Sequence, residues 1–390
     1  MGEVHDLSEI ALEKYRGWYG HEPEVAAYAP GRVEVLGNHT DYNDGYVLSA
    51  AIDCGTLFLA SSSAGKECRL VAGDVMEEAR FSLTNPLRAG DHKWPNYVMG
   101  VAVELARRDW FEGSFEGLFF GDVPIGSGLS SSAALEISAA IAISALSDSS
   151  PPHRDLARIG QRAEHEYVGA LTGLLDQITS LEGKIDSLVY TDFRSFDVRP
   201  IPLPENLVLV TLDTRTRHHL SESGYNERRH DCEAAVAHFS LSRPVGALRD
   251  VTMEELERAQ VALDPRVFRR AKHVIGENAR VLTGVECVES DQIEKFGELM
   301  YASHESSRID FENSCAELDW IVDAAHKLDW IIGARLSGGG FGGNAVLLTY
   351  REDADRTIEA LQPGYTSRFR TPFDARVIRA SDGARRIKLG

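Results

Sequence analysis

The sequence is poor in cysteine, with five among 390 residues. None stands in CxxC spacing with another and their number is odd, which argues against a disulfide framework and against a zinc site. Long apolar runs are missing too, since no stretch approaches the roughly 18 residues of a membrane span. The first residues carry no basic region followed by an apolar run, so no signal peptide is expected. These absences predict a protein of the reducing cytoplasm with no membrane partner.

Basic residues are also scarce, because 41 Lys and Arg stand against 60 Asp and Glu and leave a formal charge of −19. This balance argues against nucleic acid or an anionic membrane as a partner. An anionic ligand would need local compensation from a helix dipole, a bound cation or a few arginines. We expect a monomer whose partners are small molecules.

The chain is longer than the roughly 250–300 residues at which one hydrophobic core stops growing, so two domains are expected. The succession of predicted strands and helices restarts from about residue 199, within a stretch of prolines and polar residues at 192–204. We therefore place an N-terminal domain at 1–195 and a C-terminal domain at 196–390. In the first, apolar spacing predicts helices over 7–19, 96–107, 134–146 and 154–169, and β-rich runs predict a strand pair at 56–60 and 68–72.

Residues 121–134 read Gly-Asp-Val-Pro-Ile-Gly-Ser-Gly-Leu-Ser-Ser-Ser-Ala-Ala and suggest a ligand site. Gly126 and Gly128 carry no Cβ, so the backbone can approach a ligand closely there. Ser130, Ser131 and Ser132 follow where a helix-forming run begins, and the free N–H groups of a helix N-terminus suit phosphate. The lysine of a P-loop is absent. On this segment alone, an ordinary Gly/Ser turn before a buried helix is the alternative.

Two further segments support the ligand site. Residues 29–48 read Ala-Pro-Gly-Arg-Val-Glu-Val-Leu-Gly-Asn-His-Thr-Asp-Tyr-Asn-Asp-Gly-Tyr-Val-Leu, and residues 334–344 read Ala-Arg-Leu-Ser-Gly-Gly-Gly-Phe-Gly-Gly-Asn. With 121–134 between them, they resemble the signature, the phosphate loop and the C-terminal glycine motif of the galactokinase branch of the GHMP small-molecule kinases. The resemblance runs from about residue 7 to the end. It implies an α+β, two-domain GHMP kinase fold with the active site in the inter-domain cleft.

Two residues are candidates for the chemistry. Asp176 is a lone acid among small and apolar residues, a setting that fits either a general base or a helix N-cap. Arg32, in Pro-Gly-Arg, is either a surface arginine after a tight turn or a fixed cation. By resemblance, Asp176 accepts the proton of the sugar's anomeric hydroxyl and Arg32 offsets charge on the γ-phosphate. The implied reaction is ATP-dependent phosphorylation of D-galactose, with ATP and Mg²⁺ as cofactors.

The nucleotide is expected at the glycine loop. By resemblance, ATP contacts come from Gly126, Gly128, Leu129, Ser130, Ser131 and Ser132. Trp94 is a candidate for lining the adenine pocket, with core packing as the alternative. Glu164 alone would be a solvated helix charge, whereas the resemblance makes it a magnesium ligand together with Ser132. Magnesium prefers few protein oxygens plus phosphates, which is consistent with that pair.

A polar turn around His39 and Asp41 offers donors and acceptors for sugar hydroxyls, or forms a plain Asx turn. The resemblance makes His39, Asp41, Gly173 and Tyr225 sugar-binding residues. Asn38 departs from the family, whose members typically have a glutamate there that helps to hold the hydroxyl on carbon 6. Asparagine is neutral and can donate as well as accept. We therefore expect Asn38 at the sugar, with an altered preference at carbon 6.

Two other functions stay open on the sequence alone. One is a kinase for a related sugar altered at carbon 6 or carbon 2, such as galacturonate or N-acetylgalactosamine. A non-catalytic sugar sensor would typically have a damaged phosphate loop. Here the loop is intact, and Asp176 and Arg32 are present, so the sequence favours a kinase for galactose.

Overall fold

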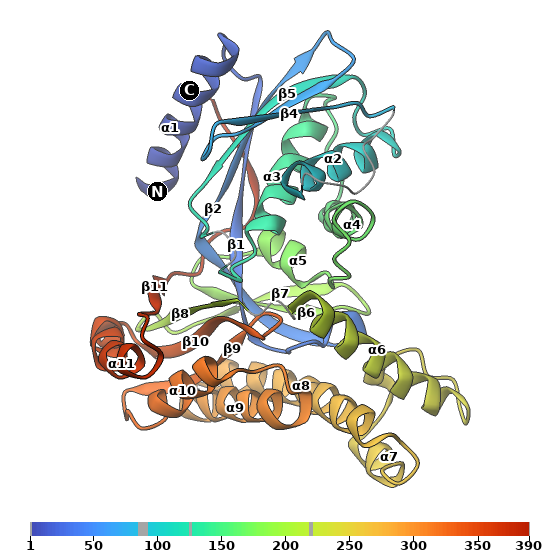
Figure 1. Cartoon of the computed structure of the whole chain (residues 1–390), viewed down its shortest axis with the longest axis vertical. Coiled ribbons are helices and arrows are strands. Elements are labelled where there is room, and N and C mark those ends of the chain that lie inside the picture. Colours follow the sequence, from blue (N-terminus) through green and yellow to red (C-terminus); the bar gives the residue numbers. More distant parts are fainter. Residues whose placement is uncertain (1, 85–92, 125–126, 218–220, 390) are drawn as a thin grey trace.

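The computed structural model describes residues 2–84, 93–124, 127–217 and 221–389. Within them the chain forms two β-sheets, one of eight strands and one of four, with helices packed against both (Figure 1). Over these same ranges, none of the helices has the length and apolar character needed to span a membrane.

The larger sheet is built around two long antiparallel strands, β1 (Val25–Leu36) and β2 (Tyr46–Ser63). Its strand order is β12-β1-β2-β5-β3-β4, with β6 paired to β2 and β7 paired to β6. The other strands are β3 (Cys68–Ala72), β4 (Glu77–Phe81), β5 (Ser114–Gly121), β6 (Ser187–Asp192), β7 (Asp197–Pro202) and β12 (Arg385–Ile387). Every residue of β1 is buried. This strand therefore lies at the centre of the fold, and it carries the first part of segment 29–48.

The expected pairing of 56–60 with 68–72 is wrong. Both segments are strands, but residues 56–63 of β2 pair with β5, while β3 pairs with β4 and, in parallel, with β5. β5 thus lies between β2 and β3 in the sheet. Consecutive strands pair in most sheets, and an inserted strand from later in the chain leaves no trace in the local pattern.

Helices cover both faces of this sheet. One face packs against α2 (Lys93–Ala106), α3 (Ser131–Ala145), α4 (His153–Ala163) and α5 (Leu175–Glu182), and α1 (Gly2–Tyr19) lies on the other (Figure 1). α3 is apolar on nearly all sides and is therefore buried along its length. The four expected helices are confirmed. The last one continues beyond Ala163 as a π-helix (Glu164–Val168), which ends at Gly169 with φ 88°.

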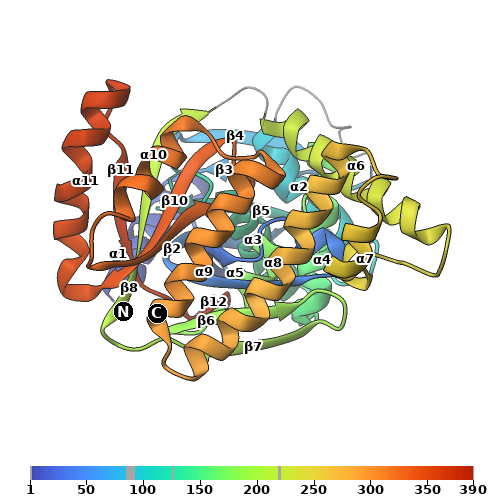
Figure 2. The ribbon, with the colours of Figure 1, turned by 90° about the horizontal axis from the view of Figure 1, so that it is seen from below.

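The second sheet is antiparallel, in the order β11-β8-β10-β9. Its strands are β8 (Leu207–Arg217), β9 (Ile331–Ser337), β10 (Gly342–Tyr350) and β11 (Asp374–Ile378). Helices α9 (Ile293–Ser306) and α10 (Ala316–Ala325) pack against it, as the view from below in Figure 2 shows. Helix α8 (Pro265–Glu289) lies beside α9 and packs against β1, β2 and β7 of the larger sheet. α6 (Ser221–Ser240) and α7 (Met253–Arg258) contact α8, and α11 (Ala354–Phe369) contacts α10.

The two parts of the chain share a hydrophobic core. Val33 and Leu48 of the larger sheet belong to the same buried cluster as Phe296 of α9 and Val346 of β10. Two strand pairings also join residues on either side of the expected boundary between 195 and 196. β7 pairs with β6, and β12 near the end of the chain pairs with β1. The boundary stays a prediction, but the parts it separates pack as one unit.

Candidate active site

The glycine loop leads directly into a helix. α3 begins at Ser131, and Ser130 before it is in the left-handed conformation with φ 60°. Gly128 has φ 82°, a conformation that glycine adopts without strain. The first N–H groups of α3 have no intrahelical acceptors, which makes this end of the helix suited to phosphate. Gly126 lies outside the described residues.

Segments from both ends of the chain hold this loop. The Arg32 N–H donates to Leu129 O at 3.0 Å. Gly31 permits that approach, because a Cβ there would lie 2.5 Å from Leu129 O. From the C-terminal glycine motif, the Asn344 side chain donates to Ser127 O. The three motifs that the sequence analysis singled out therefore meet at one place.

A cavity of about 220 Å³ lies at this meeting point. It is lined by both candidates for the chemistry, Asp176 and Arg32, and by the five residues expected at the sugar: Asn38, His39, Asp41, Gly173 and Tyr225. Gly338 and Gly339 of the C-terminal motif also line it, as do Glu34, Thr172 and Leu175, which the sequence analysis had not singled out. Because these residues come from both parts of the chain, the cavity lies between them.

Asp176, in the first turn of α5, is held from two sides. Its Oδ1 accepts a hydrogen bond from Arg32 Nε at 2.8 Å and lies 2.6 Å from Arg32 Nη2. Its Oδ2 accepts from the hydroxyl of Ser130, the residue before α3. The carboxylate is 24% exposed. It is thus fixed between a cation and the N-terminus of α3 while remaining open to the cavity.

The buried His39 and the half-buried Tyr225 form one wall of the cavity, with ring centroids 4.8 Å apart. Burial lowers the pKa of His39 to about 3, so its ring is neutral at pH 7. Its Nε2 lies 3.3 Å from Gly339 O and its Nδ1 lies 2.8 Å from the Tyr42 hydroxyl. A neutral ring that meets a carbonyl at Nε2 carries its proton there, so Nδ1 accepts from Tyr42.

Asp41 and Gly173 lie in direct contact. A Cβ at position 173 would overlap the Asp41 carboxylate, which explains the glycine. Asp41 Oδ2 accepts a hydrogen bond from the Leu175 N–H at 3.4 Å. Burial, together with the negative charges of Asp176 and Glu34, raises the pKa of Asp41 to about 6.

The Asn38 side chain is engaged by protein groups. Its Nδ2 donates to Glu34 Oε1 at 2.9 Å and to Gly338 O at 2.8 Å. Its Oδ1 accepts from Asn313 Nδ2 at 2.9 Å. Both amide N–H groups are therefore used within the protein, although Asn38 does line the cavity. Burial raises the pKa of the neighbouring Glu34, and the adjacent Arg335 opposes this shift.

The turn that carries Asn38 is anchored by Glu277 of α8. Glu277 Oε2 accepts hydrogen bonds from the N–H groups of Gly37 and Asn38 at 2.8 and 3.0 Å. Burial would raise the pKa of Glu277, but Arg280 and other nearby positive groups hold it below its ordinary value. The sequence analysis missed this residue because nothing around it in α8 indicates a turn 240 residues away.

Glu164 is a buried carboxylate near the start of α3. Among the described residues it accepts hydrogen bonds from neutral donors only: Ser132 Oγ at 3.2 Å, Gln177 Nε2 at 3.3 Å and Thr172 Oγ1. Burial raises its pKa to about 7. No three His, Cys, Asp or Glu side chains gather as a metal cluster in the part of the chain described. A magnesium ion bound mainly by phosphate oxygens would need no such cluster, and a buried carboxylate without a cationic partner fits it.

The other expected nucleotide residues lie around the same loop. Ser131 and Ser132 are partly exposed in the first turn of α3. Leu129 is buried in the core shared by the two parts of the chain. Trp94 stands near the start of α2 with its ring 5.7 Å from that of Phe119 and packs on the core.

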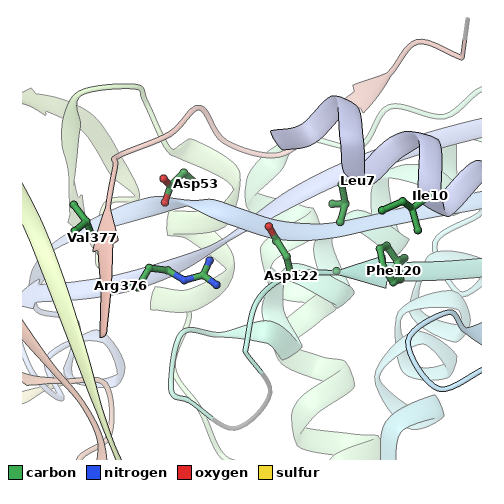
Figure 3. Close-up of a pocket in the computed structure, with 8 residues that line it drawn as sticks. Leu7, Ile10, Asp53, Phe120, Asp122, Arg376 and Val377 are labelled. Carbon is green, nitrogen blue, oxygen red and sulfur yellow. The ribbon is translucent and has the colours of Figure 1, made fainter. Parts of the chain in front are cut away.

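A larger cavity, of about 580 Å³, shares no lining residue with the first (Figure 3). Leu7 and Ile10 come from α1, Asp53 from β2 and Arg376 from β11, and Asp122 follows β5. Neither residues 127–132 nor Arg32, Glu164 or Asp176 line this cavity, so it lacks the groups proposed for phosphoryl transfer.

Comparison with known proteins agrees with this geometry. Residues 96–184 match the model of the GHMP kinases N terminal domain, and residues 285–365 match that of the GHMP kinases C terminal domain. A crystal structure of mevalonate kinase has a TM-score of 0.63 at 16% identity, covering 92% of this chain and 100% of that chain. Fold and site therefore define a GHMP kinase, and the expected two-domain α+β fold is confirmed.

The comparisons also show to which family of GHMP kinases the chain belongs. Residues 13–62 match the galactokinase galactose-binding signature. The galactokinase of Actinobacillus pleuropneumoniae is 40% identical over 345 residues, which are 87% of this chain and 89% of the relative. The crystal structure of Lactococcus lactis galactokinase complexed with galactose has a TM-score of 0.91 at 29% identity, covering 96% of this chain and 98% of that chain. The chain belongs to the galactokinase family.

Proposed function

We propose that this chain transfers the γ-phosphoryl group of ATP to the anomeric hydroxyl of D-galactose, giving galactose 1-phosphate and ADP. The observation that carries this proposal is the position of Asp176, which Arg32 and Ser130 hold between the cavity and the N-terminus of α3. A sugar in the cavity and phosphates at α3 would have their reacting groups on either side of this carboxylate. Membership of the galactokinase family supports galactose as the sugar.

Asp176 is proposed to receive the proton of the attacking hydroxyl. The O–H bond breaks as the anomeric oxygen bonds to the γ-phosphorus, and the bond from phosphorus to the β–γ bridging oxygen breaks, so that ADP leaves. Arg32 stabilises the negative charge that spreads over the transferred group. Its contact with Gly128 O, at 2.7 Å, keeps the guanidinium at the phosphate loop.

The first turn of α3 is proposed to bind the ATP phosphates through backbone N–H groups of the glycine loop and the hydroxyls of Ser131 and Ser132. Glu164 and Ser132 would hold Mg²⁺, which neutralises charge on the phosphates when bound. The Glu164 carboxylate is buried and receives hydrogen bonds from neutral donors in the described residues, which supports this assignment. Trp94 stays the candidate for the adenine side, because it lies in the first turn of α2, which packs against α3.

The sugar is proposed to lie against His39, Asp41 and Tyr225. Asp41 offers carboxylate oxygens to hydroxyl donors, and Gly173 leaves the space that this carboxylate occupies. The phenol of Tyr225 adds a group that can both donate and accept. All of these residues line the one cavity that Asp176 faces, which supports a shared ligand.

An assay of ADP release over a sugar panel tests the proposal. Galactose, glucose, galacturonate and N-acetylgalactosamine are compared, with and without EDTA, and the Asp176→Asn variant gives the background. We expect kcat/KM for galactose to exceed that of every other sugar by about tenfold or more, a difference of about 1.4 kcal/mol. Galactose binding without turnover would indicate a sensor instead. Preference for a sugar altered at carbon 2 or 6 would reassign the substrate.

We also propose a cytoplasmic location. The cysteines are all free thiols in the structure, and most of them are buried, which suits a reducing compartment. The monomeric state stays a prediction, and light scattering on the eluted protein tests it against the chain mass of 42.9 kDa.

A further inference from the structure

Glu34 is a buried carboxylate in the sugar cavity that the proposed phosphoryl transfer does not use. It lies on β1 two residues after Arg32, is 2% exposed and lines the cavity with Asn38. Its partner Arg335, on β9, is fully buried. Burying such an ion pair is costly and is weak evidence for stability alone. Its position at the cavity points to a use for the carboxylate.

The two oxygens of this carboxylate differ in their contacts. Glu34 Oε1 accepts from Arg335 Nη1 at 2.8 Å and from Asn38 Nδ2 at 2.9 Å. Oε2 accepts no hydrogen bond from any residue in the described ranges. An ionised carboxylate has acceptor sites on both oxygens. Oε2 is therefore the oxygen left to accept from a molecule in the cavity.

Asn38 is not available for that contact. Its two N–H groups are donated to Glu34 and to Gly338 O, and its oxygen accepts from Asn313. Where related kinases typically place a carboxylate at the position of Asn38, this chain has the carboxylate at Glu34 and an amide that holds it. The negative charge is thus present at the cavity, four residues earlier in the chain.

We propose that Glu34 Oε2 accepts a hydrogen bond from a galactose hydroxyl other than the one phosphorylated, and that Asn38 is the positioning residue for Glu34. The inference rests on the proposed function, because it concerns the same sugar in the same cavity. The anomeric hydroxyl must face Asp176, and that carboxylate is held by Arg32 and Ser130. Glu34 therefore acts at another carbon, where it favours a donor and disfavours an anionic substituent.

The Glu34→Gln variant tests this, because the amide keeps the shape and removes the charge. The kcat/KM values of the variant and the unmodified protein are compared for galactose and for 2-, 3-, 4- and 6-deoxygalactose. We expect the variant to lose about 10- to 100-fold on galactose, the size of one charged hydrogen bond. At least one deoxy sugar, which lacks the hydroxyl that Glu34 holds, should lose less than about threefold. Equal losses on all five sugars, or no loss on any, would overturn the proposal.

An exchange of the two side chains tests the positioning role. Asn38→Glu alone brings two carboxylates into contact and should lose activity. The double variant Glu34→Asn, Asn38→Glu again pairs one carboxylate with one amide. If the two side chains acted independently, the loss of activity in the double variant would equal the product of the losses in Glu34→Asn and Asn38→Glu. We expect the double variant to lose less activity than this product, and less of the selectivity among the deoxy sugars. A double variant that equals that product would show that Asn38 and Glu34 act independently.

Glu34→Gln leaves Arg335 without its ionic partner, so this variant can fail to fold. A crystal structure of the unmodified protein with galactose then decides the question. A hydroxyl other than the anomeric one within about 3.2 Å of Glu34 Oε2 supports the proposal, and the lack of one overturns it. Activity of the unmodified protein separates the two claims. If it does not phosphorylate galactose, the proposed function fails, whereas an active protein with an unselective variant refutes only the role of Glu34.

Discussion

Arg32 and Asp176 are in direct contact although 144 residues separate them in the sequence. Two nitrogens of the arginine lie 2.8 and 2.6 Å from the same carboxylate oxygen, and the third donates to Gly128 O at 2.7 Å. One guanidinium therefore fixes the carboxylate relative to the glycine loop. Its planar fork of donors allows these contacts together, which the single ammonium of a lysine would not.

We expect Asp176→Asn to lose about 10² to 10⁴ in kcat, the usual cost of removing a general base. Asparagine keeps the shape of the side chain but cannot take up the proton. The dissociation constant for galactose, measured by calorimetry, should stay within about tenfold, since at most one hydrogen bond to the sugar is altered. Asp197→Asn, at an exposed position on β7, is the matched control and should behave as the unmodified protein does. Near-normal turnover in Asp176→Asn would remove this residue from the mechanism.

Glu164→Gln is expected to raise the magnesium concentration needed for half-maximal rate by about tenfold or more. A neutral amide is a poorer ligand for a hard cation than a carboxylate. The loss of one charged contact weakens binding by about this factor. The measurement is a magnesium titration of the rate at saturating ATP and galactose. Glu166→Gln is the control, because this neighbour is 43% exposed and contacts only arginines among its described ionic partners. Identical titrations for the two variants would contradict the magnesium assignment.

Gly173→Ala should raise the KM for galactose by about tenfold or more, on the scale of losing a charged hydrogen bond. The added methyl group overlaps the Asp41 carboxylate, which must then leave its place in the cavity. The KM for ATP should change much less, because the methyl group lies on the sugar side. Gly17→Ala, in α1 with open space around it, controls for a glycine-to-alanine change as such. A galactose KM that does not move would show that Asp41 is not needed where it lies.

The raised pKa of Asp41 predicts a pH dependence of stability. Its ordinary value of 3.8 rises to about 6 in the folded protein. Between these values the folded protein binds more protons than the unfolded chain, so the contribution of Asp41 to the free energy of unfolding falls as pH rises. We expect Asp41→Asn, which cannot titrate, to gain stability relative to the unmodified protein from about pH 4 to pH 6, by on the order of 2–3 kcal/mol.

Denaturant unfolding of both proteins at several pH values measures this difference. Other titrating groups are common to both proteins and cancel in the comparison. The control is Asp44→Asn, on the same turn, where the side chain is 49% exposed, and it measures what an Asp-to-Asn change does at an exposed position of this turn. A difference for Asp41→Asn that does not change with pH would show that Asp41 ionises in the folded protein as it does in the unfolded chain.

The sequence predicted the members of the cavity better than the contacts that hold them. His39 and Asp41 share one turn, so a short motif contains both. Glu277 acts on Asn38 over a separation of 239 residues, and Arg335 acts on Glu34 over a separation of 301 residues. Such contacts depend on which strands and helices meet in the folded chain, and no local pattern of apolar or polar residues records them. The strand pair expected at 56–60 and 68–72 was wrong for the same reason.

The long-range contacts of Arg335 and Asn344 also bear on when activity arises during synthesis. Domains fold as units while the chain emerges from the N-terminus. When Asp176 and the glycine loop have left the ribosome, the side chains that hold Glu34 and Ser127 have not yet been made. An incomplete translation product therefore contains Asp176 and α3 without the side chains that hold Glu34 and the loop before α3. We therefore expect activity only after Asn344 has been made, rather than activity that grows with the length of the chain.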